Sequence, residues 1–125
     1  MLELEPQVKE VDLIFKTHLD IGFTDYARNV VKNYFTGFIP QALKISRQLR
    51  EENRTERFVW TTGSWLIYEF LEKAPPAERA QLEAAIVAGD ITWHGLPFTT
   101  HTELIDSSLF ESGLSLSQEL DRRFG

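Results

Sequence analysis

His18 and Asp20 are the residues whose types and spacing could do chemistry. On an extended backbone, side chains two positions apart project to the same side, so this imidazole and this carboxylate converge. One nitrogen and one oxygen donor form half of a mixed site for a divalent metal ion, and zinc suits that donor set. Gly22 then lets the chain turn at once, and Phe23 places an aromatic ring beside the polar pair. The alternative is a structural His–Asp pair that caps the following helix.

Zinc usually takes at least three protein ligands, so further donors must come from elsewhere in the sequence. His101 and Glu103 are the candidates in this chain, because they follow the apolar segment 91–96. If this segment and the one before His18 are parallel strands, both pairs of residues lie at the same edge of the sheet. The alternative for His101 and Glu103 is an ordinary surface loop.

Hydrophobic patterning predicts the elements that position these residues. Apolar runs predict three strands at 11–17, 58–62 and 91–96, and the segments that follow each of them have the spacing of amphipathic helices. An alternating order of strands and helices is typical of parallel β/α units. Three such units do not close a (β/α) barrel, which takes roughly 250 residues. We therefore predict an α/β fold in which residues 1–125 form the first, N-terminal part of an incomplete (β/α) barrel.

Local signals predict where the helices begin and end. Thr24 is expected to be the N-cap of the first helix, and Pro40 to lie in the first turn of a second helical segment after a break at Gly37. Gly89 is expected to close a helix at its C-terminal end. Ser108, with a glutamate three positions later, predicts the N-terminus of the last helix.

The stretch from His18 to Phe23 resembles the H-x-D-x-G-aromatic signature of family 38 glycoside hydrolases, the α-mannosidases. The order of the following segments is also similar: a helix, the residues 58–60, a helix that ends at 88–90, and an aromatic segment, 91–93, that runs into a polar loop. The resemblance covers nearly the whole chain, but only the first part of the family's catalytic domain.

This resemblance implies a zinc-dependent retaining glycoside hydrolase that acts on α-mannosides or related sugars, with His18 and Asp20 as zinc ligands. In that family, the loop after the third strand carries an aspartate nucleophile that is followed directly by a glutamate. Matching Glu103 to that glutamate places Thr102 at the position of the nucleophile. The alternatives are that Glu103 itself, or Asp106, is the catalytic carboxylate. This departure leaves the enzymatic activity open.

Further residues have weaker signals. His101 remains the candidate for a third zinc ligand. Phe23 and Trp65 lie at predicted strand ends and could stack against the apolar face of a carbohydrate substrate, or belong to the core. His94 is interpreted as an interior histidine, because alternation along the strand directs it away from Trp93.

Two other functions fit the same residues. A zinc-dependent carbohydrate deacetylase of related barrel fold would use zinc to activate water. A non-catalytic domain would instead pack on another chain, on a second copy of itself or on the remaining part of the barrel, through uncovered strand edges. In each case we expect the 125 residues to be inactive as a hydrolase by themselves.

Composition excludes several classes of protein. Thirteen basic residues against nineteen acidic ones give a net charge of −6, which disfavours a nucleic-acid partner. There is no cysteine, so disulfides and thiolate metal sites are excluded. The sequence shows no apolar run of the roughly 20 residues that a membrane helix needs, and its first residues do not resemble a secretory signal. These features predict a cytoplasmic protein.

Overall fold

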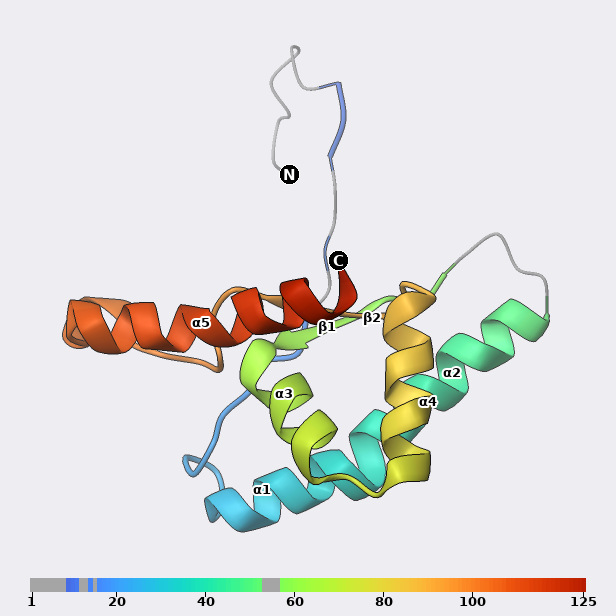
Figure 1. The fold of residues 1–125 in the computed structure, drawn as a ribbon, viewed down its shortest axis with the longest axis horizontal. Helices are drawn as coiled ribbons and strands as arrows, with labels where there is room; N and C mark the ends of the chain where they lie inside the picture. The colour runs from blue at the N-terminus through green and yellow to red at the C-terminus, as the bar shows by residue number, and fades with distance from the viewer. Residues whose placement is uncertain (1–8, 12–13, 15, 53–56) are drawn as a thin grey trace, which may run out of the picture.

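A computed structural model describes residues 9–11, 14, 16–52 and 57–125 of the chain. The elements follow one another in this order: α1 (Ala27–Asn33), the π-helix η1 (Tyr34–Phe38), α2 (Ile39–Glu51), β1 (Trp60–Gly63), α3 (Ser64–Lys73), α4 (Pro76–Val87), β2 (Ile91–His94), the 3₁₀ helix η2 (Thr102–Leu104) and α5 (Ser107–Phe124). Figure 1 shows α3 and α4 below the two short strands, and α5 running along the strands on the opposite side from α1 and α2.

The predicted fold class, a series of parallel β/α units opening a (β/α) barrel, is wrong. The described part of the chain is mostly helical and contains two short strands. β1 and β2 are parallel, in a register that pairs Trp60 with Ile91 and Gly63 with His94. Two of the three expected strands are therefore present, each shorter than the apolar run that predicted it.

The expected strand at 11–17 is the element that fails. Among the described residues of this run, Lys16 alone joins the sheet, through a parallel bridge to Thr61. Val11 and Ile14 are 68% and 75% exposed, so neither gains the burial that would stabilise a strand. The remaining positions of that apolar run, 12–13 and 15, lie outside the described residues.

The first helices form one continuous run. The predicted N-cap at Thr24 is wrong, because the helix begins at Ala27 with Tyr26 as its N-cap. The predicted break at Gly37 is also wrong, since this residue lies within η1, which joins α1 directly to α2. Pro40 does lie in the first turn of α2, but because η1 leads directly into α2 this position is inside the helical run, where proline removes one backbone N–H donor.

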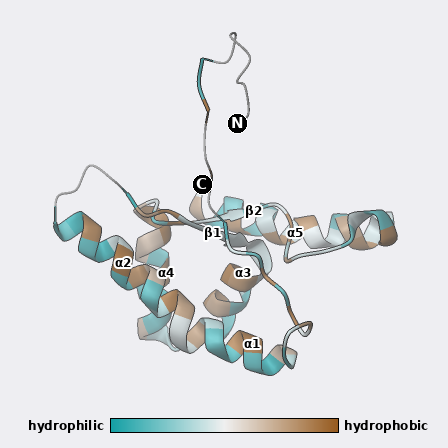
Figure 2. Cartoon of the chain, turned by 180° about the vertical axis from the view of Figure 1, so that it is seen from behind, coloured by the Kyte–Doolittle hydropathy of each residue, from teal (hydrophilic) through white to brown (hydrophobic). Residues whose placement is uncertain are grey.

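The hydrophobic core is built around α3. Leu66, Ile67 and Leu71 have no exposed surface, and Phe70 packs edge-on against Phe35 with ring centroids 4.8 Å apart. Fully burying one such side chain contributes about 1.5–3 kcal/mol. Three other helices also place buried residues in this core: α2 contributes Ile39, α4 contributes Leu82 and α5 contributes Leu120. Figure 2 shows α3 as a largely hydrophobic helix and α1 as a mixed one.

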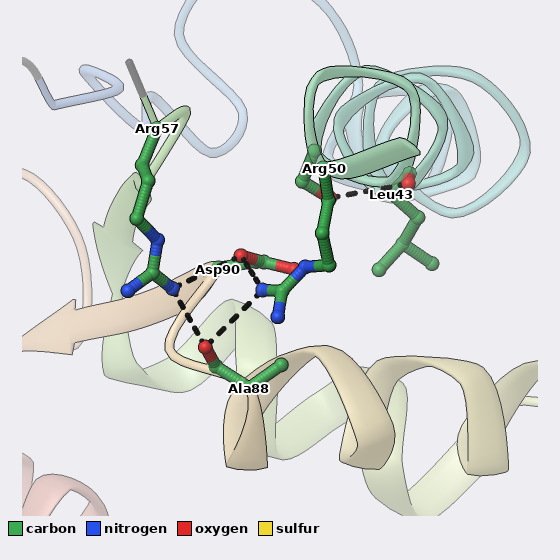
Figure 3. Close-up of polar contacts among 6 residues, drawn as sticks. Leu43, Arg50, Arg57, Ala88 and Asp90 are labelled. Atoms are coloured by element: carbon green, nitrogen blue, oxygen red, sulfur yellow. Dashed lines mark hydrogen bonds and ion pairs between the residues drawn. The ribbon is translucent and has the colours of Figure 1, made fainter. Parts of the chain in front are cut away.

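A buried carboxylate ties α2 and the start of β1 to the start of β2. Asp90, immediately before β2, has a side chain only 9% exposed, and it accepts a hydrogen bond from Arg50 at 2.5 Å. Arg57 lies 3.4 Å from the same oxygen and donates to the carbonyl oxygen of Ala88 at 2.7 Å (Figure 3). We call Arg50, Arg57 and Asp90 the arginine clamp. It holds the N-terminal end of the two-stranded sheet.

Two further predicted helix termini, at Gly89 and Ser108, have different outcomes. Gly89 has a positive φ of 75° just after α4, as expected for a helix-closing glycine. The N-cap of α5 is Asp106 and not Ser108, because the helix begins at Ser107 and the Asp106 carboxylate accepts from the Ser108 amide at 2.8 Å. Aspartate is as favourable as serine at an N-cap, and Asp106 is the residue directly before the first residue of α5.

Candidate functional site

The candidate site lies where the two parallel strands end. Gly63 and His94 are the last residues of β1 and β2. The segment 17–20 begins beside β1, because the amide of Thr17 donates to the carbonyl oxygen of Thr61 at 2.9 Å. The residues that follow Lys16 therefore leave the sheet at its C-terminal edge, the edge where ligands bind in parallel sheets.

The loop after β2 closes this edge from the other side. The amides of Ser64 and Trp65, at the start of α3, donate to the carbonyl oxygens of Leu96 and Pro97, each at 3.2 Å. Further along, the amide of Thr99 donates to the carbonyl oxygen of Leu19 at 3.1 Å. These backbone bonds bring the 17–20 segment and the 96–100 loop together, although they are far apart in sequence.

His18 and Asp20 form a contact pair. The Nε2 atom of His18 lies 3.1 Å from Oδ1 of Asp20, and the side chains are 69% and 29% exposed. The other ring nitrogen, Nδ1, lies 3.4 Å from the hydroxyl oxygen of Thr99. Leu19, between the two, is buried in the core and anchors the segment. The prediction that the two side chains converge is confirmed.

Asp20 also acts on the first residue of η1. Burial, and in second place the negative charge of Asp20, raise the pKa of the Tyr34 hydroxyl above its ordinary value. The Asp20 carboxylate therefore lies near enough to Tyr34 for its charge to affect the pKa of that hydroxyl. A single π-helical turn is often found at functional positions, and here it begins beside the His18–Asp20 pair.

A pocket of about 200 Å³ lies between the 16–19 segment and the 96–100 loop. It is lined by Lys16, Thr17, His18, Leu19, His94, Leu96, Phe98, Thr99 and Thr100. Burial, and in second place the positive charge of Lys16, lower the pKa of His94. We call this cavity the two-histidine pocket, after His18 and His94. His94 was interpreted as an interior residue, but it is half-buried at the end of β2 and lines this pocket.

The predicted catalytic carboxylates lie further along the same loop. Glu103 is in η2, and hydrogen bonds from its own backbone amide and from Thr102 lower its pKa. Asp106 caps α5, and hydrogen bonds from Ser108, first from the hydroxyl and then from the amide, lower its pKa. Both carboxylates are fully exposed to solvent. His101, which precedes η2, is exposed too.

The two aromatic candidates differ in their surroundings. Phe23 is 88% exposed, in the turn between the His18–Asp20 pair and α1. Trp65 is half-buried near the start of α3 and packs edge-on against Phe98, with ring centroids 6.2 Å apart. Phe98 itself lines the two-histidine pocket, so Trp65 supports a wall of that pocket.

His18 and Asp20 supply one imidazole nitrogen and one carboxylate oxygen, a donor set that suits zinc. The 3.1 Å between Nε2 of His18 and Oδ1 of Asp20 is the length of a direct contact between the two side chains, so the distance itself does not favour a metal ion over a His–Asp pair. The number of donors is smaller than a closed site needs. Among the described residues, no three His, Asp or Glu side chains group closely enough to hold a metal ion, so His101 and Glu103 do not complete the site.

Sequence reasoning missed the polar residues around this pair. Lys16 was read only as part of a strand, and Thr99 and Thr100 had no motif to mark them. One signal was available: a His toward the C-terminal end of one strand and a His–Asp pair after another should lie at the same edge if the strands are parallel. Applied to His94, that rule would have placed it beside His18.

Comparison with family models, curated protein sequences and solved structures gives no match to this chain. Across residues 9–11, 14, 16–52 and 57–125, no helix combines the length and the apolar character that crossing a membrane requires. The case for a function therefore depends on the geometry described above and on the resemblance of the His18–Phe23 stretch.

Proposed function

We propose that the chain contributes His18 and Asp20 as two ligands of a zinc centre in a glycoside hydrolase that acts on α-mannosides or related sugars. The observation that supports this most is the 3.1 Å contact between Nε2 of His18 and Oδ1 of Asp20 at the C-terminal edge of the strands. When bound there, zinc would supply Lewis-acid polarisation of sugar hydroxyl groups. A cytoplasmic location stays a prediction.

The residues of the chain would orient a polyhydroxy ligand at this edge. Thr99 contacts the imidazole ring, with its hydroxyl oxygen 3.4 Å from Nδ1 of His18. Phe23 offers an exposed ring on which the apolar face of a sugar could stack. The role of His18 and Asp20 is thus to bind and position, and the proton transfers of hydrolysis need other groups.

We expect these residues alone not to hydrolyse a glycoside. A general acid in this chemistry is a carboxyl group whose pKa is raised so that it keeps its proton near neutral pH. Glu103 and Asp106 have lowered pKa values and are fully exposed, so both are charged at pH 7. Glu103 or Asp106 could therefore serve only as nucleophile or base, and the general acid would have to be a different group.

Zinc binding tests the proposal directly. Purified chain is stripped with a chelator, dialysed, and titrated with zinc in a calorimeter, beside the variants His18→Ala and Asp20→Asn. We expect binding near one equivalent in the parent and its loss in both variants. Glu78→Gln, an exposed acid in the first turn of α4, is the matched control and should bind as the parent does. Folded parent protein that takes up no zinc would mean either that ligands outside these residues complete the site or that the motif is only a structural turn. A longer chain that also takes up no zinc would overturn the proposal.

A turnover assay separates the three functions that fit the sequence. The zinc-loaded chain is incubated with an aryl α-mannoside and, separately, with an N-acetylated oligosaccharide. Hydrolysis of the mannoside would contradict the expected inactivity of the chain alone, whereas release of acetate would favour the deacetylase. Zinc binding with neither reaction is the expected result, and zinc-independent association with another chain would favour the non-catalytic domain.

A further inference from the structure

The two-histidine pocket has a chemical character that a zinc site does not explain. Its described lining carries one ammonium group, two imidazoles and three threonine hydroxyls, and no carboxylate. The ammonium group of Lys16 has no carboxylate partner among the described residues, although the chain has a net charge of −6. A cation at a pocket rim without an acid beside it is a ready partner for an anion.

We propose that the two-histidine pocket binds a small oxyanion, the carboxylate or phosphate group of a ligand, through Lys16, His94 and Thr100. The three residues approach the pocket from different segments: the chain before β1, the end of β2 and the loop after it. A volume of about 200 Å³ accommodates one such group together with a few atoms of the molecule that carries it.

Thr100 supplies the second, independent observation. Its hydroxyl oxygen is buried and has no hydrogen-bond partner among the described residues. A buried hydroxyl without a partner is costly. Thr100 lines this pocket and a second, apolar one beside α5, and its hydroxyl oxygen would pair with a ligand after a small shift of the loop that uncovers it. An oxyanion accepts a hydrogen bond from a hydroxyl, so it would satisfy the Thr100 side chain.

His94 is suited to the same ligand. A neutral imidazole donates one N–H, and the half-buried position of His94 near Lys16 favours the neutral form. The pocket would therefore present one positive charge and two neutral donors, of which the charged one gives the strongest hydrogen bond. The carboxylate of Asp20 lies 3.1 Å from Nε2 of His18, and Asp20 is not part of the described lining.

The oxyanion site does not require zinc. None of Lys16, His94 and Thr100 is a proposed zinc ligand, and an ammonium group or a hydroxyl is a poor ligand for that metal. Binding of an oxyanion to chelator-treated protein and binding of zinc to His18 and Asp20 can thus succeed or fail separately. The oxyanion would thus occupy a cavity for which the proposed zinc centre provides no ligand.

The test is a titration of the ¹⁵N-labelled full chain with inorganic phosphate and, separately, with acetate, at constant pH and ionic strength in the presence of a chelator. We expect saturable shifts of the amide signals of the 16–19 and 96–100 segments, with a dissociation constant of about 1–10 mM for at least one of the two anions. Phosphate and acetate distinguish a tetrahedral from a planar group. Equal additions of sodium chloride control for ionic strength.

Two variants decide the outcome. Lys16→Gln removes the charge from an exposed side chain and should weaken binding about tenfold, and Thr100→Val should weaken it several-fold. Lys32→Gln, an exposed lysine of α1 outside the pocket, is the matched control and should bind as the parent does. Absence of saturable shifts with both anions, or binding unchanged in a folded Lys16→Gln chain, would overturn the inference.

Discussion

A Cβ atom on Gly63 would lie 2.2 Å from the carbonyl oxygen of Pro97. No real contact is that short, and both the carbonyl and its neighbours are backbone atoms that cannot simply rotate away. The loop after β2 can cross the end of β1 only because residue 63 has no side chain. The close approach therefore fixes where the 96–100 loop runs and, with it, one wall of the candidate site.

Gly63→Ala should destabilise the fold by about 1–3 kcal/mol, the usual cost of overpacking a filled interior. The measurement is the midpoint of urea denaturation. Gly37→Ala is the control, because a Cβ there meets nothing within 4 Å and the residue is helical. That control should be neutral or stabilising by up to about 1 kcal/mol. Equal midpoints for the two variants would contradict the role of the Pro97 contact.

Asp90→Asn should lower stability by about 1–3 kcal/mol, because it removes the charge that Arg50 and Arg57 share in a mostly buried position. A double-mutant cycle with Arg50→Gln isolates the pair. We expect a coupling energy of about 1 kcal/mol, since Arg50 is half-exposed and solvent screens part of the attraction. Arg57→Gln should couple less strongly, because its guanidinium is 3.4 Å away instead of 2.5 Å. Additive effects of Asp90→Asn and Arg50→Gln would show that the contact contributes nothing to stability.

His94 should make the fold less stable as the solution becomes acidic. Its pKa in the folded chain lies below the ordinary value of 6.5, so the unfolded chain binds this proton more readily. Between the two pKa values, stability therefore rises with pH, and it is constant above the unfolded value. Urea midpoints measured from pH 5 to 8 should show this slope in the parent and a smaller slope in His94→Gln. An identical slope in both proteins would mean that His94 is not the group responsible.

Asp106 should stabilise the start of α5 as an ionised N-cap. Its lowered pKa means that this contribution is complete above the unfolded pKa, near 3.8, and is lost as pH falls through the lower folded value. Asp106→Ala should lower the thermal midpoint at pH 7, whereas Asp106→Asn keeps an acceptor for the Ser108 amide and should lower it less. A midpoint unchanged by Asp106→Ala would contradict the capping role.

The sequence predicted the local contact at the site better than it predicted the fold. His18 and Asp20 converge as their spacing predicts, Gly89 closes α4 with the positive φ that glycine accommodates, and Pro40 lies in the first turn of α2. The strand expected at 11–17 failed because an apolar run does not reveal whether a neighbour exists to cover it, and Val11 in fact faces solvent. Strand formation depends on partners distant in sequence, whereas caps and short spacings are local.

The pocket residues could not be predicted for the same reason, because their positions depend on contacts distant in sequence. Nothing in the types of Thr99 and Thr100 marks them, because their position depends on a loop that is held by backbone hydrogen bonds to Leu19 and to the start of α3. The buried Asp90 was likewise read only as the residue after a helix. Its partners Arg50 and Arg57 are separated from it by 40 and 33 positions, beyond the reach of a local pattern.

The arginine clamp lies at one end of the short sheet and the two-histidine pocket at the other. Asp90 precedes the first residue of β2, and His94 is its last. The ion pairs at the beginning of β2 do not involve the side chains at its end. An exposed side chain at the far end, such as Thr99, can therefore vary over evolutionary time without loosening the clamp.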